Sequence, residues 1–381
     1  MKSTFWLFTH NFTNTGAPLV LADLARELAE VGFRARIRFV SWGGEHDRRY
    51  STLQNDLVNE GFECDILDFN SSLPRPRKCD RVLLNSLALP EAVILKALDW
   101  LEGCQISRLD WFAHEGNPGV WLPDKVWPTR IRTALQCFGL QLRVPSSSVL
   151  NTYQEWLQYT GPALQVQLPS FKLSAENQQL FANSLPTFES LRLQITAMAG
   201  SGQKGHLWLL NFIRSGLHDD QNTDPSLRPI ELYFIGLEAG PYAAFTREIC
   251  RQGVELLGDQ FHWTEHSARS DALAVMRQAN IAVSCSLAET FSLVSLEAMA
   301  LGQPLLRNRT GGCSEQLQNN INGFDLGVPS PRVTPQQIQL LRRLRDPRQI
   351  SEETLTRMAV SARETAKRFT NVKYSDWLLV D

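Results

Sequence analysis

The sequence lacks an excess of positive charge and paired cysteine motifs. Its 38 Lys and Arg residues are balanced by 40 Asp and Glu residues, which leaves a net charge of −2 at pH 7. This balance gives no electrostatic support to nucleic-acid binding, so we expect no nucleic-acid partner. The seven cysteines include no Cys-x-x-Cys pair, and their number is odd. We therefore expect reduced, buried thiols in a cytoplasmic protein, and no metal site.

Long apolar runs and secretion signals are also missing. No stretch reaches the roughly 18 apolar residues that a membrane-spanning helix needs, so we expect none. Residues 1–16 contain a short, interrupted apolar run without a cleavage pattern, which predicts no signal peptide. Peripheral contact with the inner face of a membrane remains an alternative to a plain solvated surface for a set of basic residues. These are Arg75, Arg77, Lys78, Arg130 and Arg132.

Alternating apolar and helical patterns organise the chain, whose 381 residues suffice for two domains. Short apolar runs precede helical spacing, as in 3–9 before 16–32 and in 191–199 before 206–216. This alternation predicts an α/β fold with parallel sheets. The polar, aperiodic stretch 171–190 predicts a linker between two such domains. Ligands of open α/β sheets bind beyond the carboxyl ends of the strands, so the loops that follow strands are the candidate sites.

Two loops in the first half carry candidate residues. Gly16 opens a predicted helix, whose free N–H groups would attract an anion, although a plain turn explains the glycine equally well. His114 and Glu115 directly follow a predicted strand, where a polar side chain can reach a ligand. A lone histidine is more often structural than catalytic, so a structural role for His114 remains the alternative.

A third loop, AGSGQKG at 199–205, places a lysine among small residues before a predicted helix. Small residues let the backbone approach a phosphate, and Lys204 can supply a compact positive charge. The spacing differs from a Walker motif, because no Ser or Thr follows the lysine. The alternative is a solvated lysine at a helix start, which the helix dipole disfavours.

The fourth loop begins the stretch ETFSLVSLEAMALGQP, residues 289–304, in which two carboxylates stand eight residues apart. A helix is expected to start near Ser292, whose hydroxyl can cap it. Glu289 then lies in the loop and Glu297 within the helix, so the two carboxylates have separate roles. The alternative is that Glu289 merely favours the helix dipole and that Glu297 is exposed.

The Glu-x(7)-Glu spacing, followed by Ala-Met-Ala-Leu-Gly-Gln-Pro, resembles the donor-site motif of retaining GT-B glycosyltransferases of family GT4, the glycosyl transferases group 1. The resemblance covers essentially the whole chain, because other family segments follow in order. These are TGAPLVLADLARELAEVGF, RVLLNS, His114-Glu115, Gln203-Lys204-Gly205 and TGGCSEQLQNNINGF. It implies an α/β GT-B fold, in which two Rossmann-like α/β/α domains face a central cleft.

The resemblance also implies the domain boundaries. Residues 1–170 would form an N-terminal acceptor domain, and residues 171–354 a nucleotide-sugar donor domain. Residues 355–381 would form a helix that returns to the N-terminal domain. The sequence pattern itself predicts a helix near 314–320 and only helices from there to the end.

The function implied by the resemblance is that of a hexosyltransferase-like enzyme. It would move a sugar from a nucleoside-diphosphate sugar to a hydroxyl of a glycan, a lipid-linked acceptor or a small molecule. The family implies retention of anomeric configuration, no metal and no cofactor. Bacterial relatives in the family often build surface polysaccharides or glycolipids, so the resemblance implies a role in glycan, polysaccharide or glycolipid synthesis and an acceptor that could be bound to a membrane.

Site residues follow from the resemblance position by position. Glu289 would contact donor-sugar hydroxyls, and Lys204 would neutralise the leaving diphosphate. Glu297 would accept from the ribose hydroxyls, and His114 would line the acceptor side near the anomeric carbon. The expected catalytic residues are thus His114, Glu289 and Lys204. The expected donor-binding residues are Gly16, Ala17, Gly202, Lys204, Glu289, Thr290, Phe291, Ser292, Leu293 and Glu297.

The chain departs from the family pattern in two places. Many members carry an arginine about five residues before the lysine, where this chain has Ala199. The diphosphate would then be neutralised by Lys204 or by an arginine from elsewhere, such as Arg307 or Arg309. The segment from Trp263 to Glu265 stands where the family often has a glycine.

Three other functions remain as alternatives. A nucleotide-sugar epimerase or hydrolase could use the same fold. A catalytically silent GT-B subunit that binds a partner is a further alternative, although the intact glutamate pair and Lys204 argue against it. A nicotinamide dehydrogenase is disfavoured, because no loop carries the dinucleotide fingerprint.

Overall fold

The computed structural model describes residues 3–12, 16–41, 52–67, 75–171, 181–182, 184–197, 202–217, 224–237, 242–265 and 269–379. The chain divides into two compact units. Unit 1 comprises Met1–Ser170 together with Asn371–Asp381, and unit 2 comprises Phe171–Thr370.

Unit 1 is built on a parallel sheet of seven strands in the order β3-β2-β1-β4-β5-β6-β7. Its elements in chain order are β1 (Phe5–Thr9), α1 (Gly16–Glu30), the 3-10 turn η1 (Arg34–Arg36), β2 (Ile37–Ser41), α3 (Thr52–Asn59), β3 (Glu63–Ile66), β4 (Arg81–Asn85), α4 (Glu91–Glu102), β5 (Leu109–Phe112), α5 (Pro118–Trp121), α6 (Val126–Thr133), the π-helical turn η2 (Ala134–Phe138), β6 (Leu140–Val144), α7 (Ser147–Leu157), β7 (Leu164–Val166) and α16 (Ser375–Leu379).

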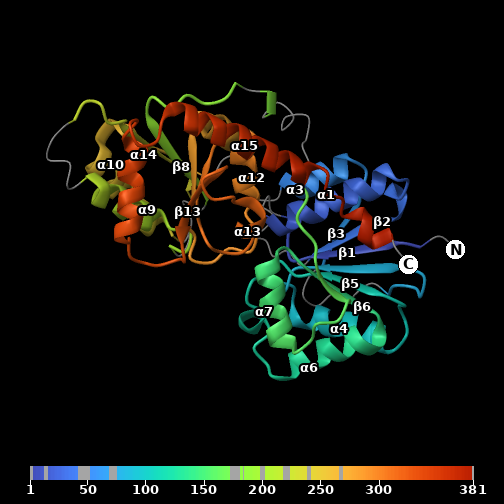
Figure 1. Cartoon of the computed structure of the whole chain (residues 1–381). Coiled ribbons are helices and arrows are strands. Elements are labelled where there is room, and N and C mark those ends of the chain that lie inside the picture. The colour runs from blue at the N-terminus through green and yellow to red at the C-terminus, as the bar shows by residue number, and fades with distance from the viewer. Residues whose placement is uncertain are drawn as a thin grey trace. The chain divides into compact units, whose positions relative to one another are not determined.

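Burial on both faces explains the composition of the unit 1 strands. All four residues of β5 are buried, as expected of a central parallel strand that helices cover on both sides. Helices α1 and α3 lie on one side of the sheet, and α4 and α6 lie on the other (Figure 1). Side chains such as Leu84, Ile94 and Trp111 form the core between the sheet and its helices.

Unit 2 is built on a second parallel sheet, in the order β10-β9-β8-β11-β12-β13. Its elements are β8 (Leu191–Thr196), α9 (His206–Leu217), β9 (Ile230–Leu237), α10 (Ala243–Leu257), the 3-10 turn η3 (Gly258–Gln260), β10 (Phe261–Glu265), α11 (Arg269–Met276), β11 (Ile281–Ser284), α12 (Leu293–Ala300), β12 (Leu305–Asn308), α13 (Cys313–Gln316), β13 (Gly323–Gly327), α14 (Pro335–Arg345) and α15 (Glu352–Thr370).

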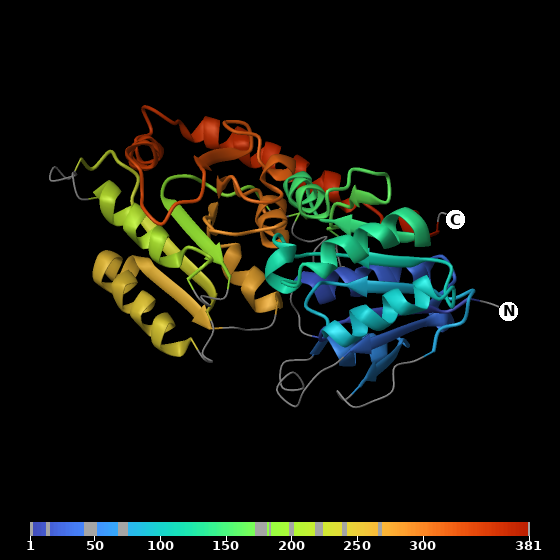
Figure 2. The same cartoon turned by 90° about the horizontal axis from the view of Figure 1, so that it is seen from below.

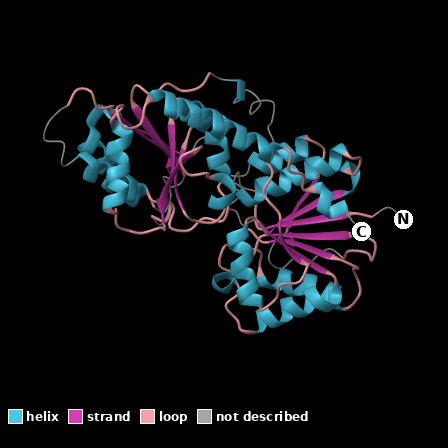
Figure 3. Cartoon of the chain, viewed as in Figure 1, coloured by secondary structure: helices cyan, strands magenta, loops and turns pink. Residues whose placement is uncertain are grey.

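The helices of unit 2 also cover both faces of their sheet. Helices α9, α10 and α14 lie on one side of β8, and α12 and α15 lie on the other (Figure 1). Figure 2 shows α9 and α10 from below, beside the strands that they cover. Figure 3 shows the same layering in both units, with helices in cyan around strands in magenta. The predicted class of two parallel α/β sheets with interleaved helices is therefore confirmed.

The prediction of only helices beyond residues 314–320 is wrong. Helix α13 is a single turn, and β13 follows it as an edge strand beside β12. Its glycine ends hide the strand pattern, because glycine is depleted in strands. Gly323 permits the close pairing, since a Cβ on it would lie 2.7 Å from the backbone nitrogen of Leu305.

Two helices take the place of the single last helix that the family resemblance implies. Helix α15 ends at Thr370 within unit 2, and the separate helix α16 lies in unit 1. The intervening Asn371 and Val372 are weak helix formers. The fully buried Tyr374 accepts a hydrogen bond from the Ser170 N–H, and Arg108 donates to the Trp377 carbonyl, so α16 is fixed to unit 1.

The expectation of buried thiols is only partly correct. All seven cysteines lie in the described ranges and none forms a disulfide, but only Cys285 and Cys313 are buried. Three cysteines (Cys79, Cys104 and Cys137) are exposed. Cys64, although it lies in the edge strand β3, is only half-buried.

The basic residues considered for membrane contact are partly neutralised. Arg77 pairs with Asp80 at 3.0 Å, and Arg130 pairs with both Asp99 and Glu102. Among the described helices, none combines the length and the apolar character needed to cross a bilayer.

Candidate functional site

The candidate site of unit 2 lies where its strand order reverses, between β8 and β11. At such a reversal point the carboxyl edge of an open α/β sheet offers a binding position. The loops that follow β8 and β11 contact each other there: the Leu287 N–H donates to the Gln203 carbonyl at 2.8 Å, and the Cys285 thiol donates to the Gly205 carbonyl at 3.3 Å. The sheet thus brings together two loops that are far apart in the sequence.

Lys204 and Glu289 form an ion pair across these two loops. The Lys204 Nζ lies 3.0 Å from Glu289 Oε2, and the other carboxylate oxygen accepts the Thr290 N–H at 3.0 Å. The Lys204 side chain is 41% exposed and that of Glu289 15%. Burial favours the neutral form of Glu289, but the charge and hydrogen bond of Lys204, the Thr290 N–H and the Arg307 charge together lower its pKa below the ordinary value. The pair therefore presents an ionised carboxylate beside a partly exposed ammonium group.

Glycine fixes the position of the Lys204 loop. Gly205 has a positive φ of 86°, and an added Cβ would lie 2.5 Å from the Cys285 carbonyl oxygen. Gly202 also has a positive φ, of 83°. Residues with a side chain rarely adopt a positive φ, so glycine is needed for the loop to lie against the end of β11. Ala199, which stands where the family often has an arginine, lies outside the described residues.

Helix α12 starts where the sequence predicts. Ser292 is its N-cap, and the Ser292 hydroxyl accepts the Ser295 N–H at 3.2 Å. Helix geometry leaves the N–H groups of the first turn without partners within the helix. The N–H group of Leu293 is one of them. Glu297 is 8% exposed, and the alternative that it is a plain surface residue is therefore wrong.

The turn after β12, which contains Gly311 and Gly312, packs against the segment that carries Glu289. The Gly311 N–H donates to the Glu289 carbonyl at 2.9 Å, and an added Cβ on Gly311 would meet Thr290 atoms at 2.7 Å. A Cβ on Gly312 would lie 2.8 Å from the Phe291 ring. Phe291 itself is 8% exposed. The two glycines therefore let the turn pack directly on the loop that carries the candidate donor-binding residues.

The two arginines considered as replacements for the missing family arginine differ sharply. The Arg309 side chain is 65% exposed and its Nε lies 2.5 Å from an Asp325 oxygen. Arg307 is fully buried and its charge acts on Glu289. Of the two, only Arg307 is therefore electrostatically part of the site.

In unit 1 the strand order reverses between β1 and β4, and a second polar group lies at that edge. The Asn85 amide donates to the Ala17 carbonyl at 2.9 Å, and its oxygen lies 2.8 Å from His114 Nε2. The oxygen can only accept, so Nε2 carries the proton and Nδ1 is left as an acceptor. Sequence reasoning missed Asn85, although a polar residue at the end of the apolar run RVLL was the available signal.

His114 is neutral in this setting. Burial lowers its pKa to about 3, and the nearby His10 adds to the effect. Its ring lies against Phe112, with centroids 4.2 Å apart. Gly16 is the exposed first residue of α1, so the structure brings Gly16, Ala17 and His114 to one edge of the unit 1 sheet.

Glu115 has a structural role beside this group. It accepts hydrogen bonds from the Ser86 hydroxyl and, at 2.7 Å, from the Leu87 N–H. Burial raises its pKa despite these donors. Ser86 adopts a positive φ of 107°, a strained conformation for a residue with a side chain. Sequence reasoning did not identify this strained turn.

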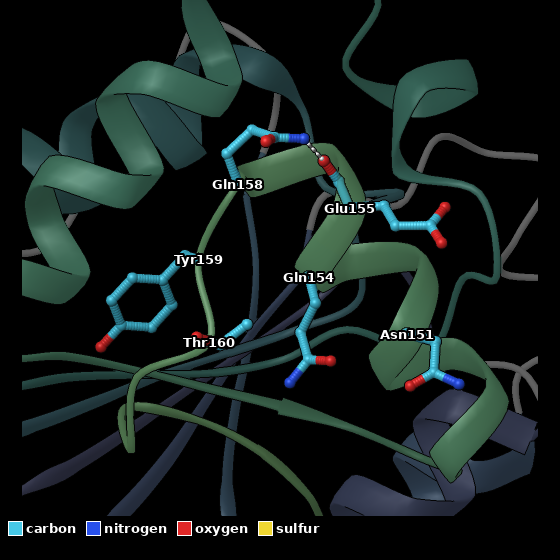
Figure 4. Close-up of a pocket in the computed structure, with 6 residues that line it drawn as sticks. All are labelled: Asn151, Gln154, Glu155, Gln158, Tyr159 and Thr160. Atoms are coloured by element: carbon cyan, nitrogen blue, oxygen red, sulfur yellow. Dashed lines mark hydrogen bonds between the residues drawn. The ribbon is translucent and has the colours of Figure 1, made fainter.

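A separate hollow lies on the outer surface of α7 and the turn after it, with a volume of about 450 Å³ (Figure 4). Its lining is polar and comes from one short segment: Asn151, Gln154, Glu155, Gln158, Tyr159 and Thr160. It contains none of the candidate residues at the strand ends. Within the described ranges, no group of three or more His, Cys, Asp or Glu side chains is placed to hold a metal ion.

Comparison with known proteins gives one family match and many structural matches. Residues 222–358 match the family model of glycosyl transferases group 1, a span that includes Glu289 and Glu297 but not Lys204. No curated protein matches the sequence.

The solved structures of HepE from Anabaena are similar over nearly the whole chain. The complex with UDP is 14% identical with a TM-score of 0.71, and the match covers 98% of this chain and 99% of HepE. The complex with UDP and glucose is 15% identical with a TM-score of 0.69, over 97% and 96% of the two chains.

Sucrose-phosphate synthase from Thermosynechococcus elongatus is also similar. It is 15% identical with a TM-score of 0.64, over 98% of this chain and 96% of that one. At such identities the likeness concerns the fold, and the expected GT-B fold is confirmed.

Proposed function

We propose that this chain is a retaining glycosyltransferase that moves a sugar from a nucleoside-diphosphate sugar to an acceptor hydroxyl. The observation that carries the proposal is the Lys204–Glu289 pair, 3.0 Å apart at the reversal point of the unit 2 sheet, beside the start of α12. A diphosphate leaving group needs positive charge and N–H donors, and a sugar needs hydrogen-bond acceptors. This edge of unit 2 offers all three.

The donor would bind unit 2. Lys204 would turn from Glu289 toward the diphosphate, where its charge stabilises the negative charge that develops as the glycosidic bond breaks. The N–H groups at the start of α12, from Phe291 to Leu293, would add to this, because helix starts favour anions. Glu289 would then accept sugar hydroxyls, and the buried Glu297 would accept from the ribose.

The acceptor would bind unit 1 near His114. Because Asn85 orients Nε2, the neutral ring offers Nδ1 as an acceptor to a sugar hydroxyl. The N–H groups of Gly16 and Ala17, at the start of α1, would form a further anion-binding position in unit 1. We further propose a cytoplasmic location and an acceptor that is a glycan, a lipid-linked molecule or a small molecule.

Substitution of the ion pair tests the site. Because HepE binds UDP and glucose, UDP-glucose is the first probe, followed by GDP and ADP sugars in a thermal-shift screen. Glu289→Gln and Lys204→Ala should each reduce transfer from the donor so found by about 100-fold or more. Glu248→Gln and Lys367→Ala alter exposed residues and serve as controls. Unchanged transfer in both site variants would refute the assignment.

Two finer properties need their own measurements. Proton NMR of the product shows whether the anomeric configuration of the donor is retained. Transfer in the presence of EDTA shows whether the reaction is independent of metal ions. Sugar release or isomerisation without an acceptor would favour a hydrolase or epimerase, and failure to bind any nucleotide sugar would favour a silent subunit.

A further inference from the structure

Arg307 is a buried charge whose hydrogen bonding is incomplete. It lies near the carboxyl end of β12, is fully buried, and donates through Nη2 to the Gly311 carbonyl at 2.6 Å. Its Nε and Nη1 atoms have no hydrogen-bond partner within the described part of the chain. A buried guanidinium with unsatisfied donors is costly, so its retention needs a reason other than stability.

Arg228, the other buried arginine in the described part of unit 2, shows the contrast. Its Nε donates to the Phe188 carbonyl at 2.7 Å. Its Nη1 donates to the Leu344 and Ile350 carbonyls at 2.7 and 2.8 Å. Arg228 therefore joins three segments as a structural residue. Arg307 joins none in this way, since its single partner belongs to the turn that immediately follows it.

The hydrogen bond between Arg307 and Gly311 links Arg307 to the Glu289 segment. The Gly311 carbonyl accepts from Arg307, while the Gly311 N–H donates to the Glu289 carbonyl. The charges of Arg307 and Glu289 also act on each other, and each favours the ionised form of its partner. Lys204 faces Glu289 from the loop before α9, whereas Cys313 and Glu315 face Arg307 from α13.

Two positive groups act on Glu289. Lys204 forms the observed ion pair with it, and Arg307 acts through its charge, which Glu315 also faces. The Arg307 charge becomes decisive once Lys204 leaves, because a carboxylate at 15% exposure without a counter-charge would take up a proton.

We propose that Arg307 is a positioning residue, which keeps Glu289 ionised and in place when Lys204 leaves it for the diphosphate of a nucleotide sugar. The role given to Lys204 rests on the proposed function, but the effect of Arg307 on Glu289 does not. A protonated Glu289 would lose acceptor capacity toward sugar hydroxyls. Arg307 thus keeps Glu289 ionised while Lys204 neutralises the diphosphate, two tasks that one lysine could not perform at the same time.

The test imitates the departure of Lys204 without any nucleotide. Lys204→Met removes the partly exposed ammonium group, and infrared spectroscopy then follows the carboxyl and carboxylate bands with pH. The same variant with Glu289→Gln identifies the Glu289 bands. In Lys204→Met, Glu289 should remain ionised at neutral pH. With Arg307→Met added, the protonated fraction of Glu289 should rise by about tenfold or more.

Two controls make the result specific. Arg309→Met removes the exposed, Asp325-paired arginine two residues further on, and should leave Glu289 as in Lys204→Met alone. Arg307→Lys keeps the charge and should also leave Glu289 ionised. If the methionine variant does not fold, Arg307→Gln makes the same comparison, because it can still donate to the Gly311 carbonyl.

Equal ionisation of Glu289 with and without the Arg307 charge overturns the proposal. No nucleotide enters the comparison, so this outcome would leave the glycosyltransferase assignment to the transfer assay. Conversely, a lack of transfer activity in the wild-type protein would not alter the infrared result.

Discussion

Replacement of Gly311 by alanine should damage the structure more than most glycine substitutions. The added Cβ would lie 2.7 Å from both the Cα and the carbonyl oxygen of Thr290, and closer still to the Glu289 carbonyl oxygen. All three are backbone atoms, which cannot rotate away as a side chain does. The clash can be relieved only if the turn after β12 or the Glu289 segment moves.

The size of the effect follows from how firmly Gly311 is held. Its N–H donates to Glu289 at 2.9 Å and its carbonyl accepts from Arg307 at 2.6 Å, so a shift in either direction weakens a buried hydrogen bond. Overpacking of this kind costs about 1–3 kcal/mol, and we expect the upper end. For a unit of this size about 3 kcal/mol lowers the melting temperature by about 6–12 °C.

Scanning calorimetry measures the effect, with Gly119→Ala as the control. A Cβ on Gly119 would meet only side-chain atoms at 3.6 Å or more, so this variant should melt close to the wild type. Gly311→Ala should also weaken donor binding, because the displaced segment carries Glu289. A melting temperature equal to that of the control would refute the inference that backbone packing fixes this loop.

Three further predictions concern individual groups. Ser292→Ala should lower the free energy of unfolding by about 1 kcal/mol in urea titrations, because α12 loses its cap; no change would mean that the cap contributes nothing. Cys137 should react with iodoacetamide in the native protein, whereas Cys285, whose pKa burial raises to about 12, should react only on unfolding; mass spectrometry of the labelled peptides tests this. Burial lowers the pKa of His206 to about 4 from its ordinary 6.5, so between these values the unfolded state binds more protons and stability falls as pH falls. The loss is up to about 1.4 kcal/mol per pH unit. His206→Phe should flatten this dependence in unfolding measured at pH 7, 6 and 5, and an unchanged slope would contradict the assignment.

The local sequence was sufficient for the main elements of the fold. Strands such as β8 and β11 are short apolar runs bounded by polar or glycine residues, and the adjoining helices show helical spacing. The start of α12 could be predicted because capping is a local interaction between Ser292 and a residue three positions later. Strand β13 was missed, because Gly323 permits close packing against β12 and glycine has a low strand propensity.

The tertiary structure alone decided which polar residues act together. Lys204 and Glu289 are 85 residues apart in the sequence, and Asn85 and His114 are 29 apart. Each pair meets because parallel strands bring their carboxyl ends to one edge, and the order of those strands depends on nonlocal packing. The sequence supplies the residue types and the loop that carries each one. The burial of Arg307 beside Glu289 depends on the whole sheet, because the environment of a charge is set by every chain segment that excludes water from it.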